Sequence, residues 1–303
     1  MEQNNAYDVI VIGSGPAGMD CALNLARGGK SVLLFEKEGI GGQIANSPRV
    51  ENIPGVMEIT GSEFASNFFD QIIERGAKFE FGEVTSISKE DNLIQVSTNS
   101  DSFFCKDLVI ATGCSHKVLG LESETKYIGK GVSFCAVCDG AFFEGKEVVV
   151  IGDANTAVQY ALYLSKICPK VTLVALFDKL FADNVLKERV KTTDNIEILY
   201  NYSTVEFVGD ETLKGILFEN TKNHEIISIP CEGAFVAIGQ KPNNEIFSEY
   251  VDLDENGYII TDENMHTKTE HIYAIGDCRR KKYRQVTTAI GDATSIAFEL
   301  TTK

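Results

Sequence analysis

The fold is decided by the stretch Asp8-Val9-Ile10-Val11-Ile12-Gly13-Ser14-Gly15-Pro16-Ala17-Gly18. A run of β-branched residues ends at a glycine-rich turn, and residues 19–26 beyond the turn have helical character. This order predicts a strand, a tight turn and a helix. The glycines are spaced for a tight turn, for close approach of a pyrophosphate and for close packing of the helix on the strand. We interpret the stretch as a dinucleotide-binding unit; the alternative is a glycine turn that serves packing alone.

The strand, turn and helix recur later in the chain. A second strand, expected over residues 31–35, ends at Glu36, where a carboxylate can accept a hydrogen bond from a ribose hydroxyl. Residues 147–151 then lead into the turn Gly152-Asp153-Ala154-Asn155-Thr156-Ala157 and a helical stretch over 158–165. A repeated unit of this kind predicts two doubly wound α/β domains, each with its own parallel sheet.

Three further runs, at residues 107–113, 234–239 and 271–277, each predict a strand that ends in a glycine turn. If the last of these returns to the first sheet, the first domain is discontinuous. We therefore expect an α/β fold of two Rossmann-like domains in which residues 117–241 are inserted between residues 1–116 and residues 242–303.

Composition excludes several classes of function. The chain has 303 residues and a formal net charge of -16, which disfavours nucleic acid as the main partner because a polyanion would be repelled. We expect no membrane span, because no apolar run approaches the roughly 20 residues that one requires. The polar residues 1–7 lack the pattern of a signal peptide, so we expect a cytoplasmic protein.

Two of the eight cysteines stand apart from the others. Cys135 and Cys138 are spaced to close a small disulfide, and Asp139 follows them as a group that could move a proton. Half of a zinc site and an inert pair of core cysteines are the alternatives, but there is no second CxxC and the four histidines show no ligand spacing. We expect no metal. The single cysteines are interpreted as small buried hydrophobic residues: Cys21, Cys105, Cys114, Cys168, Cys231 and Cys278.

The segment Cys135-Ala136-Val137-Cys138-Asp139-Gly140 resembles the active-site motif of the low-molecular-weight thioredoxin reductases. The resemblance extends over essentially the whole chain. Other segments that resemble the FAD domain of that family are Gly41-Gly42-Gln43, Glu51-Asn52-Ile53-Pro54-Gly55, Ala111-Thr112-Gly113, Gly276-Asp277 and Arg284-Gln285 followed by Thr288-Ala289.

The resemblance implies an FAD-dependent disulfide reductase, a homodimer, with thioredoxin as its substrate. Residues 1–116 and 242–303 would bind FAD, and residues 117–241 would form a redox domain with a degenerate pyridine-nucleotide fold. By the same resemblance Cys138 lies nearest the flavin, Cys135 attacks the substrate disulfide and Asp139 is the general acid/base. The implied FAD contacts are Gly13, Gly15, Pro16, Ala17, Gly18, Glu36, Gly42, Gln43, Asn52, Ala111, Thr112, Gly113, Gly276, Asp277, Arg284, Gln285, Val286 and Ala289.

The second turn departs from the family pattern. Where that family reads Gly-Gly-Gly-Asp-Ser-Ala to bind NADPH, this chain places Asp153 and Ala154 after Gly152. The family's basic stretch around the 2′-phosphate, His-Arg-Arg-x-x-x-Arg, aligns with residues 175–181, which contain none of its arginines. A switch to NADH would require an acidic residue at position 175, but the chain has Ala175 there.

An enzyme with FAD and a dithiol but no pyridine nucleotide needs another reductant. The combination is similar to the ferredoxin-dependent flavin thioredoxin reductases, so we expect reduced ferredoxin as the donor. Ferredoxins are acidic, and the run Arg279-Arg280-Lys281-Lys282-Tyr283-Arg284 is a hypothetical docking patch despite the negative net charge. The alternatives are an NADPH-dependent thioredoxin reductase with an atypical site, a dithiol oxidase that uses oxygen, and a flavin-containing redox sensor.

Overall fold

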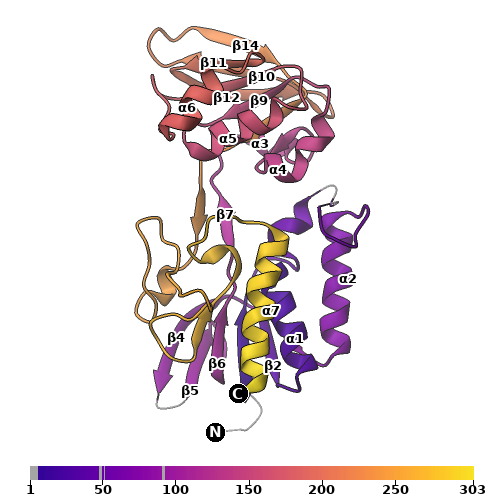
Figure 1. The fold of residues 1–303 in the computed structure, drawn as a ribbon. Helices are drawn as coiled ribbons and strands as arrows, with labels where there is room; N and C mark the ends of the chain where they lie inside the picture. Colours follow the sequence, from indigo (N-terminus) through magenta and orange to yellow (C-terminus); the bar gives the residue numbers. More distant parts are fainter. Residues whose placement is uncertain (1–5, 48–49, 51, 91–92) are drawn as a thin grey trace. The chain divides into compact units, whose positions relative to one another are not determined.

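The chain forms two compact units in the computed structural model, which describes residues 6–47, 50, 52–90 and 93–303. Unit 1 comprises Met1–Ser115 and Lys241–Lys303, and unit 2 comprises His116–Gln240. Each unit contains a sheet with parallel strands and helices packed on it, as Figure 1 shows. The α/β fold class expected from the repeated strand–turn–helix pattern is confirmed.

The sheet of unit 1 is parallel except for a hairpin at one edge. Its order is β3-β2-β1-β6-β5-β4, and β17 pairs in parallel with β6. The C-terminal part of the chain therefore returns to the first sheet. The strands are β1 (Ala6–Ile12), β2 (Val32–Glu36), β3 (Lys78–Phe81), β4 (Val84–Glu90), β5 (Leu93–Thr98), β6 (Ser102–Ile110) and β17 (Ile272–Ala274).

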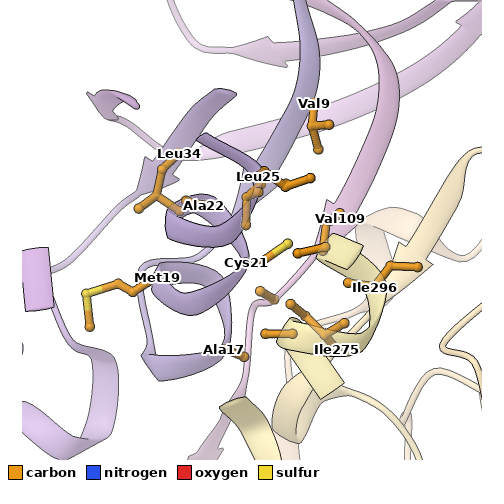
Figure 2. Close-up of a cluster of buried hydrophobic side chains, with 14 of the residues drawn as sticks. Val9, Ala17, Met19, Cys21, Ala22, Leu25, Leu34, Val109, Ile275 and Ile296 are labelled. Carbon is orange, nitrogen blue, oxygen red and sulfur yellow. The ribbon is translucent and has the colours of Figure 1, made fainter. Parts of the chain in front are cut away.

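Side chains of β1 alternate between two hydrophobic clusters. Val9 and Val11 join the cluster beneath α1 (Pro16–Arg27), α2 (Gly61–Glu74) and α7 (Val286–Thr302), whereas Ile10 and Ile12 join the cluster on the opposite face. Figure 2 shows members of the first cluster, with Cys21 of α1 beside Val109 of β6. A strand buried on both faces explains why its sequence is continuously apolar.

Unit 2 contains an all-parallel sheet and a smaller antiparallel one. The parallel sheet has the order β11-β10-β9-β15-β8, and the antiparallel sheet has the order β12-β13-β14. The strands are β8 (Val132–Ser133), β9 (Val148–Ile151), β10 (Val171–Ala175), β11 (Ile196–Tyr200), β12 (Tyr202–Gly209), β13 (Leu213–Asn220), β14 (Ile226–Pro230) and β15 (Gly233–Val236). The helices are α3 (Glu122–Tyr127), α4 (Ala136–Asp139), α5 (Asn155–Leu164) and α6 (Asn184–Lys191).

The chain passes from one unit to the other at β7 (Cys114–His116) and at β16 (Gln240–Pro242), and these two strands pair with each other. Short 3-10 helices occupy Gly42–Asn46, Gly140–Phe143, Glu245–Phe247 and Gly276–Cys278. Over the ranges described above, no helix is both long enough and apolar enough to span a bilayer.

Candidate functional site

Of the three glycines in the first turn, two are required by close backbone packing and the third faces open space. Gly13 has a φ of 107°, and a Cβ there would overlap the carbonyl oxygen of Ala111. A Cβ on Gly18 would overlap the carbonyl oxygen of Gly13. A Cβ added to Gly15, the N-cap of α1, would meet nothing within 4 Å. The open space therefore lies in front of Gly15, where the N-terminus of a 12-residue helix can attract a phosphate.

Glu36 closes one side of this turn. Its carboxylate accepts hydrogen bonds from the backbone N–H of Ser14 at 2.9 Å and from the Ser14 hydroxyl at 2.8 Å. Its other oxygen accepts the backbone N–H groups of Lys37 and Glu38, each at 2.8 Å. Burial raises the pKa of Glu36, but these hydrogen bonds outweigh burial and leave it lowered, so the group is an ionised acceptor.

Further predicted FAD contacts from distant parts of unit 1 lie against this turn. A Cβ on Gly42 would lie 3.3 Å from the Cα of Gly15. A Cβ on Gly276 would lie 2.8 Å from the Cβ of Ala17. The Gln43 amide donates to the carbonyl of Cys114. Hydrogen bonds join Asn52 with Gln285 and Arg284 with Asp277. Gly13 lies close to Thr112, and Gly276 lies close to Ala289.

Three predicted residues are placed only by their elements: Pro16 begins α1, Val286 begins α7, and Gly113 has a φ of 64° just before β7. Ala111, whose carbonyl oxygen lies against Gly13, follows β6 directly. Glu51, the first residue of one predicted FAD segment, lies outside the described residues.

The turn after β17 contains a buried oxygen without a partner. Oδ1 of Asp277 is buried and has no hydrogen-bond partner among the described residues. Burial raises the pKa of this carboxyl, and the nearby cations Lys281 and Arg284 oppose that effect. A buried acceptor of this kind calls for a donor from a ligand. The open face of Gly15, the acceptor Glu36 and this oxygen together fit the phosphates and hydroxyl groups of FAD.

Only part of the basic run beside this turn is exposed to solvent. Asp292 of α7 accepts hydrogen bonds from Gly276 N–H at 3.0 Å, Arg279 Nε at 3.0 Å and Lys281 Nζ at 2.9 Å. The guanidinium of Arg284 lies over the ring of Tyr258, 4.0 Å from its centroid. The docking role expected for Arg279 and Lys281 is therefore wrong, because both cations form ion pairs with Asp292. Arg280 and Lys282 are the exposed cations of the run.

The redox pair lies at the start of α4 in unit 2, where Cys135 and Cys138 form a disulfide. The backbone N–H of Cys138 donates to Sγ of Cys135 at 3.2 Å. A donor to sulfur favours a thiolate at Cys135 after reduction. The hydroxyl of Ser133 lies 2.6 Å from Oδ2 of Asp139 and accepts the Cys135 N–H at 3.0 Å.

Two neutral rings support the segment that carries the pair. The Tyr160 hydroxyl donates to the carbonyl of Phe134 at 3.3 Å, and the His116 ring stacks on the Phe134 ring with centroids 5.2 Å apart. Burial raises the pKa of Tyr160 to about 12, with the Asp139 charge adding to the effect. Burial also lowers the pKa of His116 to about 4. Neither ring carries a charge near neutral pH.

The second glycine turn repeats the backbone bonds of the first. Gly13 N–H donates to Phe35 and Gly152 N–H donates to Val174, each at the end of the neighbouring strand. Gly41 N–H donates to the backbone carbonyl of Ser14 at 2.9 Å, and Phe181 N–H donates to the backbone carbonyl of Asp153 at 2.7 Å. The two turns therefore have the same hydrogen-bond framework and differ in the side chains that it presents.

Those side chains are acidic or apolar in unit 2. Ala154 is the N-cap of α5, in the place that Gly15 has in α1, and Asp153 precedes it. Partial burial of Asp153 raises the pKa of its carboxyl group. At the positions of the family's arginines, Leu176, Phe177 and Phe181 are 47%, 49% and 52% exposed.

Three supporting residues were not predicted from the sequence. Asn244 is fully buried and accepts from the Thr112 hydroxyl at 3.1 Å. Asp292 organises the turn at Gly276, and Ser133 contacts Asp139. A carboxylate at position 292 within an apolar helical stretch was an available signal for Asp292; no local pattern marks the other two. The six single cysteines are all buried thiols, as predicted. No cluster of metal-ligating side chains is found where the structure describes the chain.

Comparisons with known proteins agree with this geometry. The sequence profile of the family described as "Pyridine nucleotide-disulphide oxidoreductase" matches residues 7–293. The thioredoxin reductase of Bacillus subtilis is 37% identical over 299 residues, 98% of this chain and 94% of that protein. A "34.2 kDa protein in rubredoxin operon" of Clostridium pasteurianum is 34% identical over 98% of this chain and 97% of its own length. The crystal structure of thioredoxin reductase from Streptococcus pyogenes is 36% identical, covers 98% of each chain and has a TM-score of 0.94.

Proposed function

The chain belongs to the pyridine nucleotide-disulphide oxidoreductase family as an FAD-binding, thioredoxin reductase-like enzyme, and from this premise we propose that reduced ferredoxin, not NADPH, supplies its electrons. The disulfide of Cys135 and Cys138 receives them, and the resulting dithiol reduces thioredoxin. When bound, FAD accepts electrons singly or in pairs and delivers a pair to a disulfide. In this proposal unit 1 is the FAD-binding domain, with the contacts named above, and unit 2 is the redox domain.

The observation that carries the choice of donor is the second turn. Its backbone framework is intact, but the methyl group of Ala154 stands where a pyrophosphate would approach. A carboxylate at Asp153 about 4 Å from a phosphate charge would repel it by about 1 kcal/mol in water and about 4 kcal/mol at a protein surface. Apolar side chains at Leu176, Phe177 and Phe181 give a 2′-phosphate no charge-assisted hydrogen bond.

Two further observations support a protein electron carrier. One relative is named for its place in the rubredoxin operon of Clostridium pasteurianum. Arg280 and Lys282 are exposed next to the Gly276–Asp277 turn, where they can attract an acidic carrier over a short range. Long-range steering is unfavourable because the net charge is -16.

Thiol chemistry then follows from the cysteine pair. The Cys135 thiolate attacks the thioredoxin disulfide and forms a mixed disulfide, releasing one substrate thiolate. Cys138 gives its proton to Asp139 and attacks Cys135, which restores the enzyme disulfide and releases the second substrate thiolate. Asp139 returns its proton to a departing sulfur, and a second proton comes from solvent, so that two electrons and two protons reach thioredoxin.

Location and assembly belong to the same proposal. The six remaining cysteines are buried thiols, which suits the reducing cytoplasm. The resemblance to the thioredoxin reductases supports a homodimer, and analytical ultracentrifugation of the FAD-loaded protein tests it.

An anaerobic titration of the holoprotein tests the donor. We expect reduced ferredoxin to bleach the flavin absorbance and to drive thioredoxin reduction, whereas NADPH and NADH leave the flavin oxidised. Dithionite serves as the control that the flavin is reducible. Stoichiometric bleaching by NADPH would overturn the choice of donor and favour an NADPH-dependent thioredoxin reductase.

A rebuilt second site sharpens the test. The variant carries Asp153→Gly, Ala154→Gly, Leu176→Arg, Phe177→Arg and Phe181→Arg, which restores the family pattern at the positions named. We expect this variant to gain bleaching by NADPH while the parent protein shows none. Equal behaviour of parent and variant toward NADPH would remove the second turn as the reason for donor choice.

A further inference from the structure

We propose that Ser133 is a positioning residue that holds the Asp139 carboxylate and the Cys135 backbone in one hydrogen-bonded unit, in which Asp139 exchanges a proton with the cysteine pair. The inference rests on the acid/base role proposed above for Asp139. It adds the residue through which that role is set.

Ser133 is placed by the sheet rather than by the loop that carries the thiols. It is the last residue of β8, it is paired in register with Phe235 of β15, and it is 6% exposed. A buried hydroxyl on a paired strand has little freedom to move. It is therefore a fixed reference point for the four-residue helix that follows it.

The direction of its hydrogen bonds follows from distance. A serine hydroxyl has one proton and two lone pairs. The oxygen lies 2.6 Å from Oδ2 of Asp139 and 3.5 Å from the carbonyl of Cys135. The shorter separation is the usual one for O–H to an ionised carboxylate. The hydroxyl therefore donates to Asp139, and one lone pair accepts the Cys135 N–H at 3.0 Å.

The same hydroxyl can serve both protonation states of Asp139. When Oδ2 takes a proton, that proton can be donated to the second lone pair of Ser133. The hydroxyl proton can then turn to the Cys135 carbonyl, its other acceptor. In either state the hydroxyl proton has an acceptor and the Cys135 N–H keeps its acceptor, so the carboxyl group changes its charge without a change of position. Alanine removes this exchange, and threonine retains the hydroxyl.

Other titratable groups that contact the segment do not compete for the proton. Tyr160 of α5 donates to the Phe134 carbonyl, and His116 of β7 stacks on the Phe134 ring. Burial raises the pKa of Tyr160 to about 12 and lowers the pKa of His116 to about 4. Both remain neutral between about pH 5 and about pH 9, so a profile over this range reports the carboxyl group and the thiols.

The experiment measures thiol–disulfide exchange independently of the electron donor. Holoenzyme is reduced with dithiothreitol, desalted anaerobically and mixed with the chromogenic disulfide 5,5′-dithiobis(2-nitrobenzoate) from about pH 5 to about pH 9. The six other cysteines are buried, so the fast phase reports Cys135 and Cys138. The variants are Ser133→Ala, Ser133→Thr, Asp139→Asn and the double variant Ser133→Ala/Asp139→Asn. Ser165→Ala is the matched control, because that hydroxyl donates to the Leu162 carbonyl at 3.0 Å at the end of α5.

We expect Ser133→Ala to slow exchange roughly 10-fold at neutral pH and to move the acid limb of the profile upward by about one pH unit, because the ionised carboxylate loses a donor. Ser133→Thr restores most of the rate, and Ser165→Ala leaves it unchanged. In the Asp139→Asn background the serine substitution has less than about a two-fold effect, because the two residues act as one unit.

Three results would overturn the inference. The first is the same loss from Ser133→Ala in both backgrounds, and the second is an unmoved acid limb. The third is a normal rate for Asp139→Asn, which removes the proton carrier itself. Failure of ferredoxin to reduce the flavin would end the proposed donor but would not touch this assay.

Discussion

The first glycine turn makes a prediction in which stability and cofactor affinity separate. Gly15→Ala changes a residue whose added methyl group meets nothing within 4 Å and whose φ of -67° suits any residue. Gly18→Ala places the same methyl group into the carbonyl oxygen of Gly13. One substitution therefore intrudes on the ligand, and the other intrudes on the fold.

The magnitudes follow from those surroundings. Alanine is a poorer N-cap than glycine, but it reduces the entropy of the unfolded chain, so Gly15→Ala should change the free energy of unfolding by less than about 1 kcal/mol. A methyl group between the backbone and a phosphate should remove about one charge-assisted hydrogen bond. That loss is about 1.5–3 kcal/mol, or roughly a 10- to 150-fold weaker Kd for FAD. Gly18→Ala should cost at least about 3 kcal/mol of stability, because a backbone carbonyl cannot yield as a side chain can.

Two assays separate the two effects. Urea unfolding of the apoprotein gives stability, and quenching of FAD fluorescence on titration with apoprotein gives affinity. Gly291→Ala is the matched control, because it is an exposed glycine within α7 with open space around it, and it should add about 0.5–1 kcal/mol of stability without changing the Kd. The reasoning is refuted if Gly15→Ala binds FAD within about three-fold of the parent, or if its apoprotein loses as much stability as Gly18→Ala.

Three other predictions concern unit 2 and the turn after β17. Serine at Cys135 or Cys138 should lower thioredoxin reduction at least about 1,000-fold while FAD content stays the same, measured by turnover and flavin absorbance. Folded His116 resists protonation down to about pH 4, whereas the unfolded chain takes that proton near pH 6.5, so unfolding binds a proton in this window and stability falls as pH falls. His116→Phe should remove roughly 2–3 kcal/mol of that fall between about pH 7 and about pH 4.5, measured by urea unfolding. Asp292→Asn should cost about 3–5 kcal/mol, because it leaves the largely covered cations Arg279 and Lys281 without their counter-charge, and should weaken FAD binding in the same titration.

Features that depend on neighbouring residues in the chain were predictable. The units β1–turn–α1 and β9–turn–α5 follow from apolar runs, glycine spacing and helical character within about 20 residues. Ends were less predictable. The helix expected to begin at Met19 begins at Pro16, because proline is tolerated in a first helical turn. The strand expected from Asp107 begins at Ser102, because its first half pairs with β5.

Supporting contacts between distant residues could not be read from the sequence. The run from Arg279 to Arg284 reads as one basic patch, yet Asp292 holds two of its cations in an ion pair with side chains 9–14% exposed. Local charge counting cannot detect a carboxylate that arrives on another element. Asn244 reaches Thr112 across 132 positions of sequence, so no local pattern could connect them.

The two turns show why a dinucleotide unit can lose its ligand and keep its fold. Gly152, with a φ of 147°, remains where a Cβ would overlap the carbonyl of Ala237, so the fold itself requires that glycine. Ala154 stands where only a ligand requires glycine, because its counterpart Gly15 faces open space. The parallel sheet still has a task, since β8 pairs with β15 and ends at Ser133 beside the thiols. If the proposed function is right, this sheet has lost its nucleotide and still holds Ser133, and through it Asp139, beside the redox pair.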